Sequence, residues 1–240
     1  MPPKLTILFF SAIFCLNTSK AQTFFELQSN FTQIDLPKYP SKVAVSLNHS
    51  NNEFEVAINK GKLTIIKKGN ENTNCNLKLS NGTLVGIDNG EWGGQLLFKP
   101  NDGKKKNIEV HKGNIKFIFR YRDKIYFIES LAHLSISEGA LFQLIPAKNG
   151  FSTTKLIDFG DAPLAFTIFN NKFLIATYDN FYTVSNFKKQ LVVEKAFWDG
   201  LYPNSLAVLN DKDVFIGMRG GVAMLDLTTG SLKFYKYNYE

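Results

Sequence analysis

Asp213-Val-Phe-Ile-Gly217 is a short apolar strand set between a polar turn and a loop, and three other stretches share this layout. They are Gly82-Thr-Leu-Val-Gly86, Lys124-Ile-Tyr-Phe-Ile128 and Lys172-Phe-Leu-Ile-Ala176, and the four starts are spaced by 42, 48 and 41 residues. Each strand is followed, after a connection, by a second apolar strand. A β unit that recurs about every 40–45 residues has the period of a propeller blade.

The rest of the chain also favours strands. It contains 22 Phe and 9 Tyr, its turn residues recur at short intervals, and no segment after residue 22 has the period of a helix. These features predict an all-β protein. Four clear units and a weaker N-terminal one predict a single β-propeller of five blades, with six as the alternative. The strands expected in the N-terminal part are Phe24–Leu27, Phe31–Leu36, Val43–Leu47, Phe54–Ile58 and Leu63–Lys67.

The last unit carries a family resemblance. Its segment Gly220-Gly-Val-Ala-Met-Leu-Asp-Leu-Thr-Thr-Gly230 resembles the third strand and exit turn common in the YVTN and quinoprotein-like β-propeller superfamily. The resemblance extends over the four units, residues 76–240. It implies a fold and no particular activity, because many functions share this scaffold.

The N-terminus has the pattern of a signal peptide. Lys4 precedes the apolar run Leu5–Leu16, which is shorter than the roughly 20 residues that span a bilayer. Ser19-Lys-Ala21 then places small residues where signal peptidase cleaves. We therefore expect a leader over residues 1–21 and a secreted or periplasmic propeller domain over residues 22–240. No transmembrane segment is expected, and lipidation of Cys15 is disfavoured because Phe14 precedes it.

Charge and cysteine content exclude several classes. The formal net charge of +7 is spread along the chain, and the dense run Lys104–Lys106 adjoins a turn. No basic patch with interleaved aromatics is found, so no nucleic-acid partner is expected. Cys75 is the single cysteine after the leader, which rules out an intrachain disulfide and favours a buried, unreactive thiol. No cofactor motif is present, so none is expected.

Candidate site residues fall on one rim of the expected propeller, where loops between the second and third strands join the connections between blades. The two loops expected to be long are Asp88–Gly94 and Glu129–Gly139. Loops on a rigid scaffold often carry function. The residues expected around this mouth are Glu91, Trp92, Glu129, His133, Glu138, Asp161, Trp198, Asp199, Tyr202 and Arg219.

Several of these residues have structural alternatives. Trp92 could pack between blades while Glu91 caps a turn, and His133 could be a hydrogen-bonded structural histidine. Trp198, beside a glycine-rich turn, could lie half in the core. Arg219 could be a solvated arm or an anion clamp. No metal site is expected, because the three histidines are far apart in sequence and lack the spacing of a zinc motif.

Two functions follow from this rim. The first is a non-catalytic binding module for a glycan, peptide or protein, with Trp92, His133, Trp198, Asp199, Tyr202 and Arg219 as its ligand contacts, since Trp and Tyr combine flat apolar faces with a polar group. The second is an exported glycan-directed hydrolase or lyase with paired carboxylates. Glu91, Glu129 and Glu138 are the candidate acids, because glycoside cleavage uses two carboxyl groups at a defined separation.

Overall fold

The structure is a computed structural model that describes residues 30–69, 74–148 and 150–238. The expected leader and the expected strand Phe24–Leu27 lie outside the described residues. The protein is all-β, with 62% strand and 5% helix, and its strands form several small antiparallel sheets, none of which closes on itself. The all-β prediction is confirmed.

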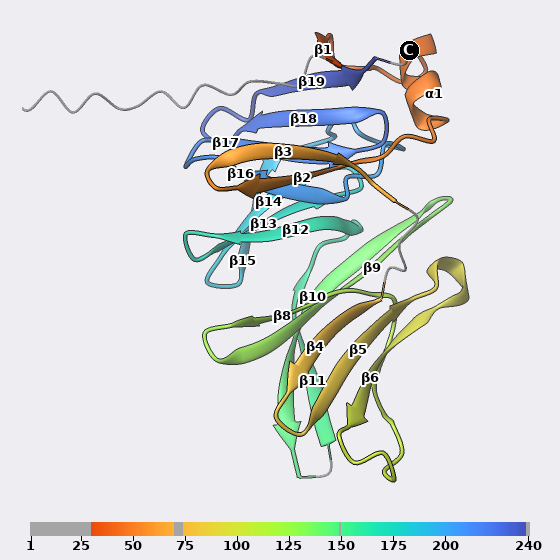
Figure 1. Ribbon diagram of the computed structural model, residues 1–240, viewed down its shortest axis with the longest axis vertical. Coiled ribbons are helices and arrows are strands. Elements are labelled where there is room, and N and C mark those ends of the chain that lie inside the picture. Colours follow the sequence, from red (N-terminus) through yellow and green to blue (C-terminus); the bar gives the residue numbers. More distant parts are fainter. Residues whose placement is uncertain (1–29, 70–73, 149, 239–240) are drawn as a thin grey trace, which may run out of the picture.

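Two four-stranded meanders lie toward one end of the molecule (Figure 1). In each, consecutive strands pair with one another, and Ser80–Asn81 and Arg122–Asp123 form two-residue turns. The first contains β4 (Cys75–Leu79), β5 (Gly82–Asp88), β6 (Gly94–Pro100) and β7 (Ile108–Lys112). The second contains β8 (Ile115–Tyr121), β9 (Lys124–His133), β10 (Ile136–Ala147) and β11 (Gly150–Asp158).

Two further meanders follow in the chain. The third contains β12 (Pro163–Phe169), β13 (Lys172–Thr177), β14 (Phe181–Ser185) and β15 (Lys188–Val193). The fourth contains β16 (Ser205–Val208), β17 (Asp213–Met218), β18 (Gly221–Asp226) and β19 (Leu232–Tyr237), and the N-terminal β1 (Phe31–Ile34) pairs with its outer strand β19. The strand expected over Phe31–Leu36 is observed as β1, and its pairing with β19 joins the beginning of the described chain to its end.

A two-stranded hairpin, β2 (Phe54–Asn59) and β3 (Lys62–Lys67), completes the set. Phe54 and Val56 of β2 pack against Phe215 and Val222 of the β16–β19 sheet. Hydrophobic clusters also join β16–β19 to β12–β15, β12–β15 to β8–β11, and β8–β11 to β4–β7. None of the clusters formed by the described residues joins β2–β3 to β4–β7, which are the two ends of this series.

Val43–Leu47, expected as a strand, is helical, so this prediction was wrong. Helix α1 (Lys42–Asn48) begins after Ser41, whose Oγ accepts a hydrogen bond from the Ala44 N–H at 3.3 Å. Serine is among the best residues at this capping position. Leu47 anchors the helix in the core at 1% exposure, and this tertiary contact outweighs the strand preference of the two valines.

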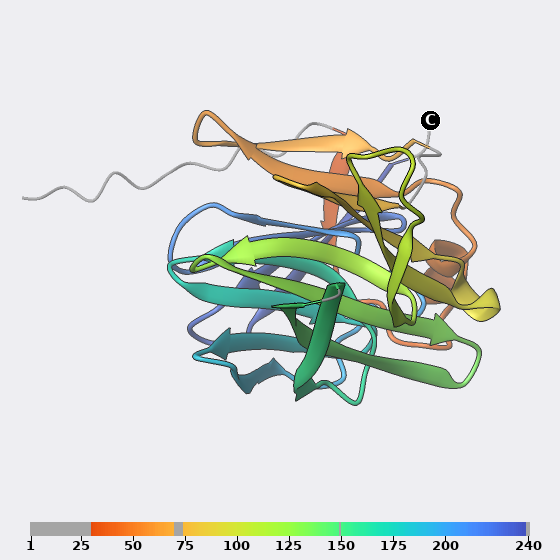
Figure 2. The ribbon, with the colours of Figure 1, turned by 90° about the horizontal axis from the view of Figure 1, so that it is seen from below.

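The stretch expected as a long loop, Glu129–Gly139, is also different. Strands β9 and β10 run through it and form an extended hairpin that turns at Leu134 and Ser135. Glu129, His133 and Glu138 therefore project from a paired ladder, not from a loop. The hairpin tip lies on the same side of the molecule as α1 and the β5–β6 connection, opposite the β8–β9 and β12–β13 turns (Figure 1). Figure 2 shows the hairpin from below, with its tip on the same side of the molecule as the β5–β6 connection.

Candidate functional site

A groove of about 460 Å³ separates the β4–β7 sheet from the β9–β10 hairpin. Its walls combine acidic and amide groups, one lysine, apolar groups and one tryptophan. The lining residues that matter below are Trp92, Gly113, Asn114, Glu129, Leu131 and Glu138. Three of the sequence-predicted site residues, Trp92, Glu129 and Glu138, thus line one concave surface.

Glu129 and Glu138 project from the same face of the β9–β10 ladder. Glu129 pairs with Ala140, and Leu131 pairs with Glu138. Directly paired residues share a face, and so do residues two apart on one strand, so the two glutamates are diagonal neighbours on the face that lines the groove. Diagonal positions lie about 7–8 Å apart.

His111 holds Glu129 in place. Its Nε2 lies 2.7 Å from Glu129 Oε2, and its ring packs against Phe127 and Phe142 at centroid distances of 5.0 and 4.7 Å. A Cβ at Gly113 would come within 2.5 Å of the same Oε2, so glycine leaves the space that this carboxylate occupies. The Glu129 carboxylate is therefore fixed by a histidine that is itself fixed by two rings.

Glu91 and His133 form a second pair at the groove's outer edge. His133 Nε2 lies 2.8 Å from Glu91 Oε2, and both side chains remain partly exposed. The contact joins the short helix η1 (Gly90–Trp92), in the β5–β6 connection, to the tip of β9. The structure thus brings Glu91 and His133 into contact, and His133 has the polar partner that its structural alternative requires.

Trp92 projects into solvent beside the groove, with 84% of its surface exposed. The alternative in which Trp92 packs between sheets was therefore wrong. Its loop is nevertheless held by the buried Asn114, which donates from Nδ2 to the Gly90 carbonyl at 2.8 Å and accepts from the Asn89 N–H at 3.3 Å. The exposed indole thus projects from a loop whose backbone is held by the hydrogen bonds of Asn114.

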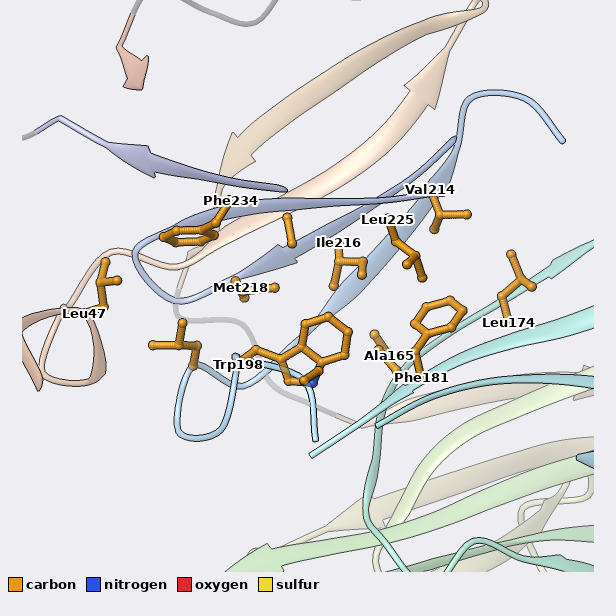
Figure 3. Packing of buried hydrophobic residues seen from close by; sticks show 14 residues of the cluster. Leu47, Ala165, Leu174, Phe181, Trp198, Val214, Ile216, Met218, Leu225 and Phe234 are labelled. Carbon is orange, nitrogen blue, oxygen red and sulfur yellow. The ribbon is translucent and has the colours of Figure 1, made fainter. Parts of the chain in front are cut away.

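Trp198 was expected as a ligand contact at the rim, and this prediction was wrong. Its side chain has no exposed surface and lies among Phe181, Met218 and Phe234 in the largest hydrophobic cluster (Figure 3). The indole N–H donates to the Thr177 carbonyl at 3.1 Å, which satisfies the one polar group it brings into the core. Trp198 joins the β12–β15 and β16–β19 sheets and cannot reach a ligand at the surface.

Arg219 is neither a solvated arm nor a free anion clamp. It donates to the Asn48 carbonyl at 2.8 Å and to Glu53 Oε1 at 3.3 Å, and its guanidinium lies 4.9 Å from the centre of the Tyr202 ring. The nearby carboxylate balances the positive charge. Arg219 and Tyr202 therefore fasten α1 and the start of β2 to the β17–β18 turn.

Asp199 lines a different cavity, of about 560 Å³, between α1 and the β15–β16 connection. Burial and a hydrogen bond to the Asp199 carboxylate raise the pKa of Tyr178. Burial, followed by the charges of Asp161 and Asp199, raises the pKa of Asp179, which also lines this cavity. Asp199 and the groove residues line separate cavities, so the ten residues expected around one mouth do not form one site.

Asp161 is buried and serves as a structural acceptor. Its carboxylate accepts hydrogen bonds from the Ser137 and Thr177 hydroxyls, the Asn180 side chain, and the Ala162 and Asp179 N–H groups. These donors saturate both oxygens. Asp161 therefore ties β10 to the β13–β14 turn and is not available to a ligand.

His111 and Asn114 were missed as site residues in the sequence. His111 lies near the end of β7, and Asn114 lies in the connection between β7 and β8. The sequence does indicate a connection between sheets at this point. Their partners, Glu129 and Gly90, lie 18 and 24 residues away in the chain, so no local pattern identifies either contact.

Other features of the described residues limit the possible chemistry. No three His, Cys, Asp or Glu side chains in the described ranges gather as a metal site. No described helix has the length and apolarity needed to cross a membrane. No family model matches the chain, and no curated protein matches it in sequence.

Proposed function

We propose that this protein is a binding module for a carbohydrate, and that the ligand lies in the groove beside Trp92. The observation that carries the proposal is the 84% exposure of Trp92 next to a groove lined by carboxylate and amide groups. A sugar ring presents an apolar face that can stack on an indole, and its hydroxyls donate to carboxylates. Glu129 and Glu138 are the acceptors.

Preorganisation also supports binding in this groove. Asn114 fixes the Trp92 loop, and His111 fixes Glu129, so both groups keep their positions without a ligand. Groups that are already ordered lose less conformational entropy when the ligand binds. Asp199, Tyr202 and Arg219 do not line this groove, and we assign them no ligand contact.

The test is a glycan array probed with the purified protein, followed by titration of the best glycan. Trp92→Ala is expected to weaken binding by about tenfold or more, since an aromatic anchor contributes about 2 kcal/mol. Glu129→Gln should also weaken it, and Lys105→Ala, in the exposed β6–β7 turn, is the control. If Lys105→Ala weakens binding as much as Trp92→Ala does, the groove is not the site.

A glycan-cleaving enzyme is the second candidate, and the shared face of Glu129 and Glu138 favours it. Hydrolysis needs one carboxylic acid to protonate the departing oxygen and one carboxylate to activate water or attack the sugar, about 5–9.5 Å apart. Glu129 and Glu138 are diagonal neighbours, and such positions lie about 7–8 Å apart, which falls within that range. Mass spectrometry of the bound glycan after incubation tests it: cleavage that Glu129→Gln and Glu138→Gln both abolish would establish the enzyme, and an intact glycan would exclude it.

We propose that the five sheets are the blades of one propeller. Five sheets in the described residues favour five blades over six, and the pairing of β1 with β19 resembles the way propellers join their ends. Closure requires β2–β3 to meet β4–β7. Small-angle X-ray scattering distinguishes the possibilities, because a closed ring has a shorter maximum dimension than an open series of the same sheets.

Export remains part of this proposal. The signal-peptide pattern of residues 1–21 supports a secreted or periplasmic protein. N-terminal sequencing of the exported protein should start at Gln22. A retained Met1 or a lipid on Cys15 would contradict it.

A further inference from the structure

The turns on the side of the molecule opposite the groove gather positive charge. The β4–β5, β6–β7, β8–β9 and β12–β13 turns each have an exposed lysine or arginine in the turn or within two residues of it. These residues are far apart in the chain, so the sequence shows only a charge spread along its length. We call the following exposed residues the basic face: Lys78, Lys105, Arg120, Arg122, Lys124 and Lys172.

Hydrogen bonds show that these turns are neighbours. The Asn101 N–H, at the start of the β6–β7 turn, donates to a carbonyl of the β4–β5 turn at 3.0 Å. Arg120, beside the β8–β9 turn, donates to the Lys78 carbonyl at 3.4 Å. The Tyr121 hydroxyl donates to the Asn171 carbonyl of the β12–β13 turn at 3.0 Å. The four turns therefore form one continuous surface, although they belong to three sheets.

The positive charge of the basic face is not neutralised by the described chain. None of its members forms an ion pair with a described carboxylate, whereas Lys116, on the groove side, pairs with Asp88 at 3.4 Å. The acidic residues within the four turns are Asp102 and Asp123. Asp102 Oδ1 accepts the N–H of a neighbouring turn residue at 3.0 Å, so this carboxylate stabilises its own turn. The basic face thus keeps an excess of positive charge.

The composition of the basic face indicates the class of partner. A surface of one charge sign attracts its opposite, and clustered lysines and arginines bind anionic lipid surfaces. The exposed Phe, Tyr and Trp side chains in the described ranges are Tyr39 and Trp92, and neither belongs to the basic face. Single-stranded nucleic acids and sugar rings bind largely by stacking on aromatic rings, which this face does not offer. A linear polyanion would follow one row of charges, whereas a lipid surface meets the turns of three sheets together.

We propose that the basic face binds the surface of a bilayer that contains anionic phospholipids. The lysine and arginine side chains donate to the headgroup phosphates, and no part of the chain needs to enter the hydrocarbon. Each cationic residue close to such a surface strengthens binding about fivefold, so several must act together. In this orientation Trp92 and the groove stay in solution on the other side of the molecule (Figure 1). The contact is independent of whether the groove binds a carbohydrate.

The experiment is co-sedimentation of the exported protein with vesicles of phosphatidylcholine alone and of phosphatidylcholine mixed with phosphatidylglycerol. The protein should bind only the mixed vesicles, and it should leave them as added salt screens the charges. Glutamine at four positions together should weaken binding about a hundredfold or more, whereas arginine at the same positions keeps the charge and the binding. These positions are Lys78, Lys105, Lys124 and Lys172.

A matched control removes the same net charge from exposed residues outside the basic face and should weaken binding by less than about fivefold. It combines Lys38→Gln, Lys42→Gln, Lys67→Gln and Lys155→Gln. Tryptophan emission gives the orientation of the bound protein. Trp92 is exposed on the groove side and Trp198 is buried, so the emission should not shift to shorter wavelength when vesicles are added.

The outcomes separate the possibilities. No binding to the mixed vesicles at low salt overturns the proposal, and so does equal weakening by the two sets of glutamine substitutions. A shift of the Trp92 emission shows that the groove side meets the lipid and also overturns it. Binding to duplex DNA or polygalacturonate at a salt concentration where the protein has left the vesicles identifies a linear polyanion as the partner and overturns it as well. Circular dichroism checks the fold of each variant, and the single glutamine variants, each weakened about fivefold, replace a combined variant that does not fold.

Discussion

Replacing Asp161 should destabilise the protein more than replacing any exposed aspartate. Its carboxylate joins the β8–β11 and β12–β15 sheets through Ser137 on one side and Thr177, Asp179 and Asn180 on the other. Asp161 is 3% exposed, so water cannot take over these hydrogen bonds. The perturbations are Asp161→Ala, which removes the acceptor, and Asp161→Asn, which keeps its shape.

The expected magnitude follows from the donors that lose their acceptor. In Asp161→Ala the Thr177 hydroxyl can still donate to the Asn180 carbonyl, 2.9 Å away, and the Ala162 N–H to Ser137 Oγ at 3.0 Å. The Asp179 N–H, the Asn180 side-chain amide and the Ser137 hydroxyl lose the acceptor shown here. A buried donor without an acceptor costs about 1–3 kcal/mol, so the free energy of unfolding should fall by about 3–5 kcal/mol. Asp161→Asn should cost about 2 kcal/mol, because one oxygen remains and the charge is lost.

Urea unfolding followed by circular dichroism measures these differences in the free energy of unfolding. Equal slopes of that free energy against urea concentration indicate that the variants expose the same surface on unfolding. Asp158→Ala is the matched control, since its exposed carboxylate makes a surface pair with Lys155 at 3.1 Å. Exposed pairs contribute about 0–1 kcal/mol. If Asp161→Ala costs no more than this control, the hydrogen bonds around Asp161 do not hold the two sheets together.

Two further predictions concern the interior. Burial raises the pKa of the Cys75 thiol from 9.0 to about 11, so the folded chain keeps this proton at pH values where the unfolded chain has lost it. The free energy of unfolding should therefore fall by up to about 2–3 kcal/mol as the pH rises from about 9 to 11. Urea titrations of Cys75→Ala should not show that loss. An identical pH dependence of the free energy of unfolding in both proteins would contradict the burial of the thiol. Trp198→Ala should cost about 3–5 kcal/mol in the same assay and Trp198→Phe less, whereas a loss below about 1 kcal/mol in Trp198→Ala would show that the indole does not bridge the sheets.

Local sequence determined the secondary structure of most of this protein. Alternating apolar residues and polar turns depend on neighbours within a few positions, so strands such as β2, β5, β13 and β17 could be predicted closely. The exceptions are informative. The capping residue Ser41 was a local signal for α1, but Val43 and Val45 favour strands, and the burial of Leu47 decided the outcome.

Tertiary structure alone decided which residues form the site. Trp92 and Trp198 both lie near glycines in expected connections, yet one is 84% exposed and the other has no exposed surface. The difference depends on which sheets pack against each indole, and those contacts join residues far apart in the chain. The pairing of Glu129 with His111 is equally non-local, because β7 and β9 meet only when their sheets stack. Residue type and local period thus specify strands and turns, whereas exposure and side-chain partners depend on packing between sheets.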